Sequence, residues 1–214
     1  MQLSMQGLVP AHLQERLRVH RTGVWNTDVA MTAGAIVLVQ APSGTGKTTL
    51  IHMLYGLRND YNGRISWGGK DIATMDDAGW ARQRRESLSV IFQDMRLFPS
   101  LTALENIEVK RLLTNSVAAA QVQEWMSRLG ITDKADALAA TLSYGELQRV
   151  AIIRALVQPF SWLLMDEPFS HLDVVNRQNA IALIQEVVQQ QQAGMLLAEL
   201  DSNDYFDYTQ TLLM

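Results

Sequence analysis

The sequence predicts an α/β protein with a mainly parallel sheet and an inserted helical lobe. Two apolar runs of strand length, at residues 35–39 and 162–165, are each followed by a segment whose apolar residues recur at helical spacing. A continuous apolar run of this length is typical of a strand that is covered on both faces in a parallel sheet. Between the two runs, residues 95–160 have mostly helical patterns, and this stretch predicts the lobe.

The N-terminal third predicts strands, a helix and a hairpin in turn. The pattern is strand-like from Leu3 to Val39, and Leu17 and Val19 alternate with basic neighbours as on a half-exposed strand. Residues 48–57 predict a helix because their leucines and isoleucine lie on one helical face. Residues 64–72 predict a β-hairpin around a Gly-Gly turn.

The C-terminal half predicts helices that give way to further strands. One helix of the lobe is indicated by apolar residues at positions i, i+3, i+4 and i+7, namely Val122, Trp125, Met126 and Leu129. Pro159 closes the helical stretch. Beyond it we expect a strand at residues 161–166, a helix at 176–192 and a last strand at 209–214.

Length and composition exclude several classes of protein. At 214 residues the chain predicts one domain, residues 1–214, with the lobe at about 95–160. A formal net charge of −4 argues against a basic nucleic-acid coat, and no direct nucleic-acid partner is expected. With no cysteine, disulfides, cysteine-ligated metals and thiol catalysis are excluded. Neither a membrane-spanning run nor a secretory signal is seen, so we expect a protein that is soluble or reaches a membrane through a partner.

Residues 41–49, between the first apolar run and the next helix, have the arrangement of a phosphate-binding loop. Gly44 and Gly46 would let backbone N–H groups approach phosphate oxygens at the positive N-terminus of that helix. Lys47 would bridge the β- and γ-phosphates, and the Thr48 hydroxyl would ligate Mg²⁺. Ala41 stands where the strict pattern has its first glycine, a change that we expect the loop to tolerate. The alternative is a glycine-rich turn that carries a lysine by chance. The nucleotide contacts expected here are Ser43, Gly44, Thr45, Gly46, Lys47, Thr48 and Thr49.

Two acids, Asp166 and Glu167, stand at the end of the second apolar run. In a parallel sheet this is the edge at which ligands bind. Asp166 is suited to hold Mg²⁺ through its water shell, and Glu167 to polarise a water for attack on the γ-phosphate. Alternatively, the two are an ordinary acid pair in a strand-end turn.

Residues 142–146 predict an unusual helix start. Ser143 is followed three residues later by Glu146, which is the pattern of a capping box with free N–H groups and a positive dipole end. Gly145 would leave this end open to a closely approaching anion. The alternative is an ordinary helix start without a ligand.

Together these motifs resemble those of the ATP-binding cassette (ABC) family. From about Gly34 to Asp201 they occur in the family's order and spacing: the phosphate loop, Phe92-Gln93, Leu142-Ser-Tyr-Gly-Glu146, the acid pair and Ser170-His-Leu-Asp173. The resemblance implies a P-loop NTPase core with a mainly parallel sheet, an N-terminal antiparallel β part and an inserted helical lobe. It also implies ATP and Mg²⁺ as cofactors and a head-to-tail homodimer of the cassette.

The resemblance also implies roles for matching residues. It gives three catalytic residues, Lys47, Gln93 and Glu167, and three magnesium ligands, Thr48, Gln93 and Asp166. Gln93 would link the metal and the attacking water to the helical lobe. Ser143 and Gly145 would contact the γ-phosphate held by a second copy of the protein, and Asp173 would help the two sites communicate.

A finer resemblance lies in residues 98–107, which look like the ATPase subunits of the lipoprotein-release, macrolide-efflux and cell-division group. It implies that Phe98 and Leu101 lie near a groove that receives a cytoplasmic helix of the membrane partner. Alternatively, both pack inside the helical lobe. The expected partner is an integral membrane permease subunit, and the expected location is the cytoplasm, peripheral on the inner face of the cell membrane.

Two positions depart from the family pattern. The family has an aromatic ring that stacks on adenine about thirty positions before the phosphate loop, where this chain offers only His12, with Trp25 as a substitute elsewhere. The family also has a histidine, next to an aspartate, that contacts the γ-phosphate. Matching that aspartate to Asp201 puts Leu200 at the histidine's place, and a slip of one residue puts Glu199 there. Neither can donate a hydrogen bond as imidazole does, which predicts slow hydrolysis.

The predicted function is an ATP-binding and ATP-hydrolysing subunit that powers a membrane transporter or mechanotransmission complex through ATP-driven dimer closure. One alternative is a degenerate cassette that binds ATP as a switch with little hydrolysis, in keeping with the missing histidine. Another is a soluble ABC ATPase acting on DNA or ribosomes. Such proteins have long coiled coils or two cassettes in one chain, and the sequence shows neither.

Overall fold

The computed structural model describes residues 1–17 and 22–214. The strands are β1 (Leu3–Pro10), β2 (Val29–Met31), β3 (Ile36–Gln40), β4 (Tyr61–Trp67), β5 (Lys70–Asp71), β6 (Leu88–Ile91), β7 (Trp162–Asp166), β8 (Gly194–Glu199) and β9 (Gln210–Leu213). The helices are α1 (Gln14–Leu17), α2 (Lys47–Leu54), α3 (Asp77–Glu86), α4 (Ala103–Thr114), α5 (Ala119–Arg128), α6 (Tyr144–Leu156) and α7 (Val174–Gln190).

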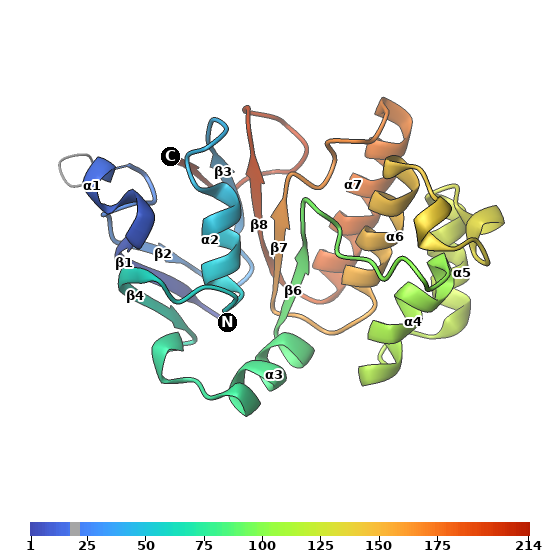
Figure 1. The fold of residues 1–214 in the computed structure, drawn as a ribbon, viewed down its shortest axis with the longest axis horizontal. Helices are drawn as coiled ribbons and strands as arrows, with labels where there is room; N and C mark the ends of the chain where they lie inside the picture. The colour runs from blue at the N-terminus through green and yellow to red at the C-terminus, as the bar shows by residue number, and fades with distance from the viewer. Residues whose placement is uncertain (18–21) are drawn as a thin grey trace.

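Over the described residues the strands form two sheets. The antiparallel sheet has the order β2-β1-β4-β5, and the parallel sheet has the order β6-β7-β8-β3-β9. The parallel sheet stands in the middle of the molecule, with α2 and the antiparallel sheet on one side (Figure 1). Helices α6 and α7 cover its other side, and α4 and α5 lie beyond them. The predicted mainly parallel sheet, antiparallel N-terminal part and helical lobe are therefore confirmed.

The parallel strands are apolar throughout because both of their faces are buried. In β3, Val37 and Val39 belong to the hydrophobic cluster under α2, whereas Leu38 belongs to the cluster on the α6 side. In β7, Leu163 faces the α6 side and Leu164 the α2 side. Successive side chains of a strand point to opposite faces, so two covered faces require an unbroken apolar run.

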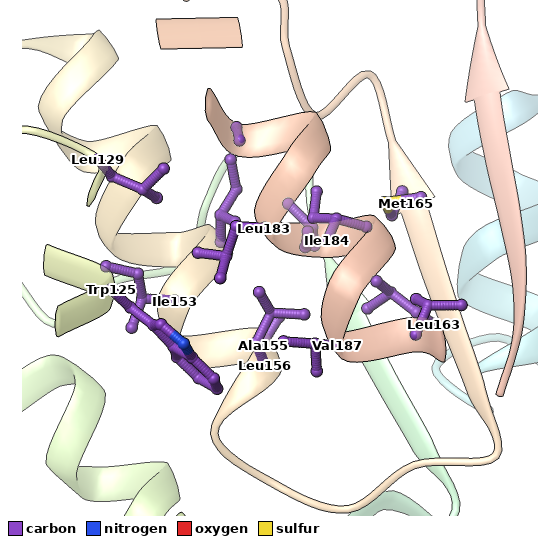
Figure 2. Packing of buried hydrophobic residues seen from close by; sticks show 14 of the residues in the cluster. Trp125, Leu129, Ile153, Ala155, Leu156, Leu163, Met165, Leu183, Ile184 and Val187 are labelled. Carbon is purple, nitrogen blue, oxygen red and sulfur yellow. The ribbon is translucent and has the colours of Figure 1, made fainter. Parts of the chain in front are cut away.

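The helical lobe joins the sheet through α6 and α7. Figure 2 shows side chains of both helices packed together and against β7. Leu183 and Ile184 of α7 meet Ile153 of α6 in this cluster, and Trp125 of α5 lies at its lobe end. Helix α6 therefore lies between the lobe and the sheet.

Several smaller expectations are confirmed. The hairpin pairs Trp67 with Lys70 across the Gly-Gly turn. The helix predicted at residues 176–192 is α7, which begins two residues earlier because Asp173 caps it by accepting from the Asn176 N–H. None of the helices within the described residues combines the length and apolar character that crossing a membrane requires.

Three short elements differ from expectation. The strand predicted around Leu17 is wrong over residues 14–17, which form α1, and Val19 lies outside the described residues. Leu13 and Leu17, four residues apart, both pack into the cluster under α2, and this helical spacing overrides the local alternation. Helix α3 and strand β6 were not anticipated. Strand β6 has four residues, and one of them is a serine, Ser89, so its apolar run is too short to predict a strand. Ser89 is nevertheless buried, and its hydroxyl donates to the Ala155 carbonyl (2.6 Å).

Candidate functional site

The loop between β3 and α2 has the backbone that its glycines predict. Gly44 and Gly46 have φ angles of 76° and 106°, in the left-handed region that favours glycine. A Cβ at Gly46 would meet the Trp25 ring at 3.1 Å, and the Trp25 indole N–H donates to the Thr45 carbonyl (3.1 Å). Trp25 therefore supports the loop from below. Ala41 does not have a positive φ angle, which explains why the loop has no need of glycine there.

Lys47 is buried beneath this loop and is fully engaged. Its Nζ donates to the Ala41 and Pro42 carbonyls (2.8 and 3.3 Å) and forms an ion pair with Glu167 Oε1 at 3.3 Å. On the other side, Gln93 Nε2 donates to Glu167 Oε2 at 3.3 Å. The Glu167 carboxylate thus lies between Lys47 and Gln93, two of the side chains with which the sequence grouped it.

Asp166 is buried, and its carboxylate oxygens have no hydrogen-bond donor within the described residues. Burial raises its pKa, while the nearby Thr48 hydroxyl, which does not complete a hydrogen bond, favours the charged form. Thr48, Gln93 and Asp166, the predicted magnesium ligands, line one cavity of about 200 Å³. An uncompensated carboxylate beside hydroxyl and amide oxygens fits a hard divalent cation.

A second cavity, of about 280 Å³, opens over the phosphate loop. His12, Gln93 and Glu167 line this cavity. Most of the predicted nucleotide contacts line it as well, namely Ser43, Gly44, Gly46, Lys47, Thr48 and Thr49. Thr45 instead turns its hydroxyl to the Pro42 carbonyl (2.7 Å). His12 is the exposed ring at this cavity, whereas Trp25 is 1% exposed and cannot stack on a base. The suggestion that Trp25 supplies the stacking ring is therefore wrong, because its ring is buried against the phosphate loop.

Ser143 and Gly145 lie apart from these two cavities, at the start of α6. The predicted capping box is present: the Ser143 side chain accepts from the Glu146 N–H, and the Glu146 carboxylate accepts from the Ser143 N–H (2.8 Å). Hydrogen bonds to the Glu146 carboxylate, first from the Ser143 N–H and then from the Ser143 hydroxyl (both 2.8 Å), lower the pKa of Glu146. The chain thus brings Lys47, Gln93, Asp166 and Glu167 together but leaves Ser143 and Gly145 to face elsewhere.

The register of β7 and β8 places Glu199, one of the two residues matched to the missing histidine, beside the acid pair. Asp166 pairs with Ala198, and Glu167 N–H donates to the Ala198 carbonyl (3.0 Å). This puts Glu199 next to Glu167, while Leu200 is 41% exposed. Burial, and next the charge of Glu167, raise the pKa of Glu199 to about 7.

Two long polar side chains of α6 were missed by sequence reasoning. Arg154 donates to the carbonyls of Met95 (2.5 Å) and Arg96 (2.7 Å), two non-glycine residues with φ angles of 58° and 49° just beyond Gln93. Gln148 is fully buried and contacts the turn after Asp166. A polar residue within an otherwise apolar helix face was the available signal, but its partners are distant in sequence.

Comparison with known families agrees with this geometry. Residues 24–170 match the sequence profile of the family described as ABC transporter. The chain belongs to this family. It is 34% identical over 188 residues to an uncharacterized ABC transporter ATP-binding protein of Mycobacterium tuberculosis (strain CDC 1551 / Oshkosh). That alignment covers 86% of this chain but 56% of the relative, so the chain spans little more than half of that protein.

Other similar proteins carry the name of a lipoprotein-releasing system. The lipoprotein-releasing system ATP-binding protein LolD of Nitrobacter hamburgensis (strain DSM 10229 / NCIMB 13809 / X14) is 35% identical over 175 residues, which are 80% of this chain and 75% of LolD. Among solved structures, the dimeric ABC transporter cassette MJ0796 superposes with a TM-score of 0.79 at 22% identity, covering 93% of this chain and 88% of that one. The same cassette bound to ADP and Pi gives 0.78. These structures show that the ABC chain described here has the cassette fold.

Proposed function

We propose that this ABC cassette binds and hydrolyses ATP, and that two copies close on ATP to drive a membrane partner. The observation that carries the proposal is the ion pair of Lys47 with Glu167 at the phosphate loop. A buried lysine whose anionic partner is the hydrolytic carboxylate is set to exchange that carboxylate for phosphate. The relatives named as ATP-binding proteins support the same activity.

Nucleotide binding would release Glu167. The β- and γ-phosphate oxygens take over the Lys47 ammonium, while the backbone N–H groups of residues 43–48 surround the phosphates at the start of α2. The Ala41 and Pro42 carbonyls accept from the same ammonium and keep it at the loop during this exchange. The exchange leaves Glu167 with Gln93 as its remaining neighbour.

Magnesium fits beside the phosphates. Asp166, Thr48 and Gln93 would hold it, Asp166 through a water. When bound, the ion neutralises charge on the β- and γ-phosphate oxygens. Its arrival would also relieve Asp166, whose carboxylate otherwise lacks a partner within the described residues.

Hydrolysis would then depend on Glu167 and Gln93. A water held by both side chains attacks the γ-phosphorus, its proton passes to Glu167, and the bond from γ-phosphorus to the β,γ-bridging oxygen breaks to give ADP and phosphate. Gln93 orients the water, since its amide lies at hydrogen-bond distance from the carboxylate. Lys47 offsets the negative charge that develops on the leaving oxygen.

A second copy would complete the site. Ser143 and Gly145 lie at the open N-terminus of α6, a position that favours an anion, yet they line neither cavity around Lys47. We therefore assign them to the γ-phosphate held by the other copy. Asp173 caps α7 two residues after His171, close to the start of α6, and would transmit the state of one site to the other.

The mass of Glu167→Gln in solution tests this proposal. The variant keeps the length of the side chain but cannot take the proton, so it should bind ATP–Mg²⁺ without releasing it. Light scattering should show a dimer with ATP–Mg²⁺ and a monomer with ADP. A monomer in both conditions, with ATP bound, would contradict closure around two nucleotides.

The membrane partner would dock on the lobe. Beside the exposed Phe98 lies a groove of about 380 Å³, largely apolar and lined by Asp94, Met95, Leu97, Pro99, Ala139, Ala140, Leu142, Tyr144 and Leu147. The side chain of Phe98 is 51% exposed rather than packed in the lobe, which favours the first of the two interpretations of residues 98–107. A cytoplasmic helix of an integral membrane permease is the proposed occupant, and it would hold the cassette at the inner face of the membrane.

The place of the missing histidine favours a second candidate, an ATP-binding switch with little hydrolysis. Glu199 stands beside Glu167 and Leu200 is exposed, so the site lacks the imidazole donor that the family has for the γ-phosphate. Comparing ATP affinity with turnover separates the two functions. Tight binding with turnover no higher than that of Glu167→Gln would favour the switch.

A further inference from the structure

The backbone of Glu167 is held in an unfavourable conformation. Its φ angle is 46°, in the left-handed region that residues with a side chain rarely adopt. On one side its N–H is fixed by the Ala198 carbonyl of β8 (3.0 Å). Because a strained residue persists only where its surroundings impose it, its carbonyl side must be held as well.

The Glu167 carbonyl accepts from the Ser170 N–H within the turn itself (3.4 Å), and the link from outside the turn is supplied by Gln148 of α6. Its amide Nε2 donates to the Glu167 carbonyl (3.3 Å), and its Oε1 accepts from the His171 N–H (3.0 Å). One side chain therefore spans the turn from Glu167 to His171. Gln148 is fully buried, so water does not compete for either hydrogen bond.

Helix α6 has little freedom to move against this turn. A Cβ at Gly145 would lie 3.0 Å from the His171 carbonyl, and the Tyr144 ring stacks on the His171 ring at a centroid distance of 5.2 Å. The start of α6 and the turn after β7 thus pack directly on each other. The Gln148 amide is the polar link within this contact.

The direction of the Glu167 side chain follows from this backbone. With the left-handed conformation imposed, its two carboxylate oxygens reach Lys47 at 3.3 Å and Gln93 at 3.3 Å. Without Gln148 only the longer contact with the Ser170 N–H (3.4 Å) holds the carbonyl, so the residue would relax toward an ordinary φ angle and the carboxylate would leave this position. A displacement of about 1 Å is enough to impair a hydrolytic base.

We propose that Gln148 is a positioning residue for hydrolysis: from the middle of α6 it holds the Glu167 backbone so that the carboxylate points at the attacking water. The inference rests on the proposed role of Glu167. Because Ser143, which would meet the second nucleotide, begins the same helix, Gln148 also ties the alignment of one site to the helix that contacts the other.

Gln148→Met tests the inference, since methionine has nearly the same length but lacks both the amide N–H donor and the amide oxygen acceptor. The matched control is Gln158→Met. Gln158 is also a buried glutamine, and its Nε2 donates to the carbonyls of Arg84 and Leu88 (both 2.9 Å), at a place that is not in contact with Glu167. Both variants lose buried amide hydrogen bonds, so a general loss of stability affects both. If Gln148→Met does not fold, Gln148→Asn, one methylene too short for both partners, replaces it.

The first readout does not require activity. In the nucleotide-free protein, amide hydrogen exchange at His171 should be at least tenfold faster in Gln148→Met than in wild type, and within twofold of wild type in Gln158→Met. Unchanged exchange at His171 in Gln148→Met would overturn the inference.

The second readout is kinetic. Gln148→Met should lower kcat by 10- to 100-fold while the Kd for ATP–Mg²⁺ stays within twofold, and it should lower turnover no further in a Glu167→Gln background. If Glu167→Gln reduces turnover and Gln148→Met does not, the positioning role is refuted while the proposed function stands. If Glu167→Gln itself has wild-type turnover, the proposed hydrolytic role of Glu167 falls, and with it the positioning role of Gln148.

Discussion

Glu199 makes the stability of the nucleotide-free protein depend on pH. Its carboxyl is largely buried beside Glu167, and its pKa rises from 4.5 to about 7. In the unfolded chain the group loses its proton near its ordinary pKa. Between these two values the folded protein holds a proton that the unfolded chain has released. The contribution of Glu199 to the free energy of unfolding therefore falls as pH rises from about 4.5 to 7 and stays low above that range.

The size of the effect follows from the shift. A rise of this size corresponds to about 3 kcal/mol, since one pKa unit is about 1.4 kcal/mol. The carboxyl keeps some contact with solvent, and screening reduces the figure to about 1–2 kcal/mol. Glu199→Gln cannot ionise. We therefore expect it to stabilise the protein by about 1–2 kcal/mol relative to wild type at pH 8, and by much less at pH 5.

Chemical unfolding at both pH values, without nucleotide, measures this difference. Glu86→Gln is the control, because Glu86 lies exposed at the end of α3, paired with Arg85. It should show the same small effect at pH 5 and pH 8. A Glu199→Gln variant whose gain is equal at the two pH values, or which is less stable than wild type at pH 8, would refute the reasoning.

Three further predictions concern the loop, the missing histidine and the segment after Gln93. Gly46→Ala should weaken ATP binding at least tenfold by titration calorimetry, because φ is 106° and the new methyl meets Trp25. Gly34→Ala, with φ of 77° and no neighbour within 4 Å, should leave affinity unchanged. Leu200→His or Glu199→His should raise ATP turnover above wild type by providing an imidazole donor, and the prediction fails if neither variant changes turnover. Arg154→Met should cost about 1–2 kcal/mol in chemical unfolding, since the part-buried Met95 carbonyl and the exposed Arg96 carbonyl lose their charged donor; a loss below about 0.5 kcal/mol would contradict this.

Much of the fold could be predicted because its patterns are local and long. The apolar runs of β3 and β7 are unbroken because both faces are covered, and α7 shows its apolar face over more than two turns, from Ala180 to Val188. Short elements escaped prediction. At α1, Leu17 and the preceding Leu13, one turn apart, outweighed an apparent alternation, and β6 offers four residues with a serine among them. Such segments are too short to show a repeating pattern of apolar residues, and tertiary contacts decide their structure.

The chemical groups of the site can be identified along the chain alone, because each motif is a local piece of backbone. The glycines of the phosphate loop, the capping box at Ser143 and the acids at the end of β7 act through neighbours a few residues away. Which of these groups meet depends on how the chain folds in three dimensions. The fold brings Gln93 to Glu167, puts Glu199 rather than Leu200 beside that carboxylate, places Trp25 beneath the loop and passes the Gln148 amide across the turn. These contacts depend on strand register and on the packing of α6 against the sheet, and spacing along the chain specifies neither.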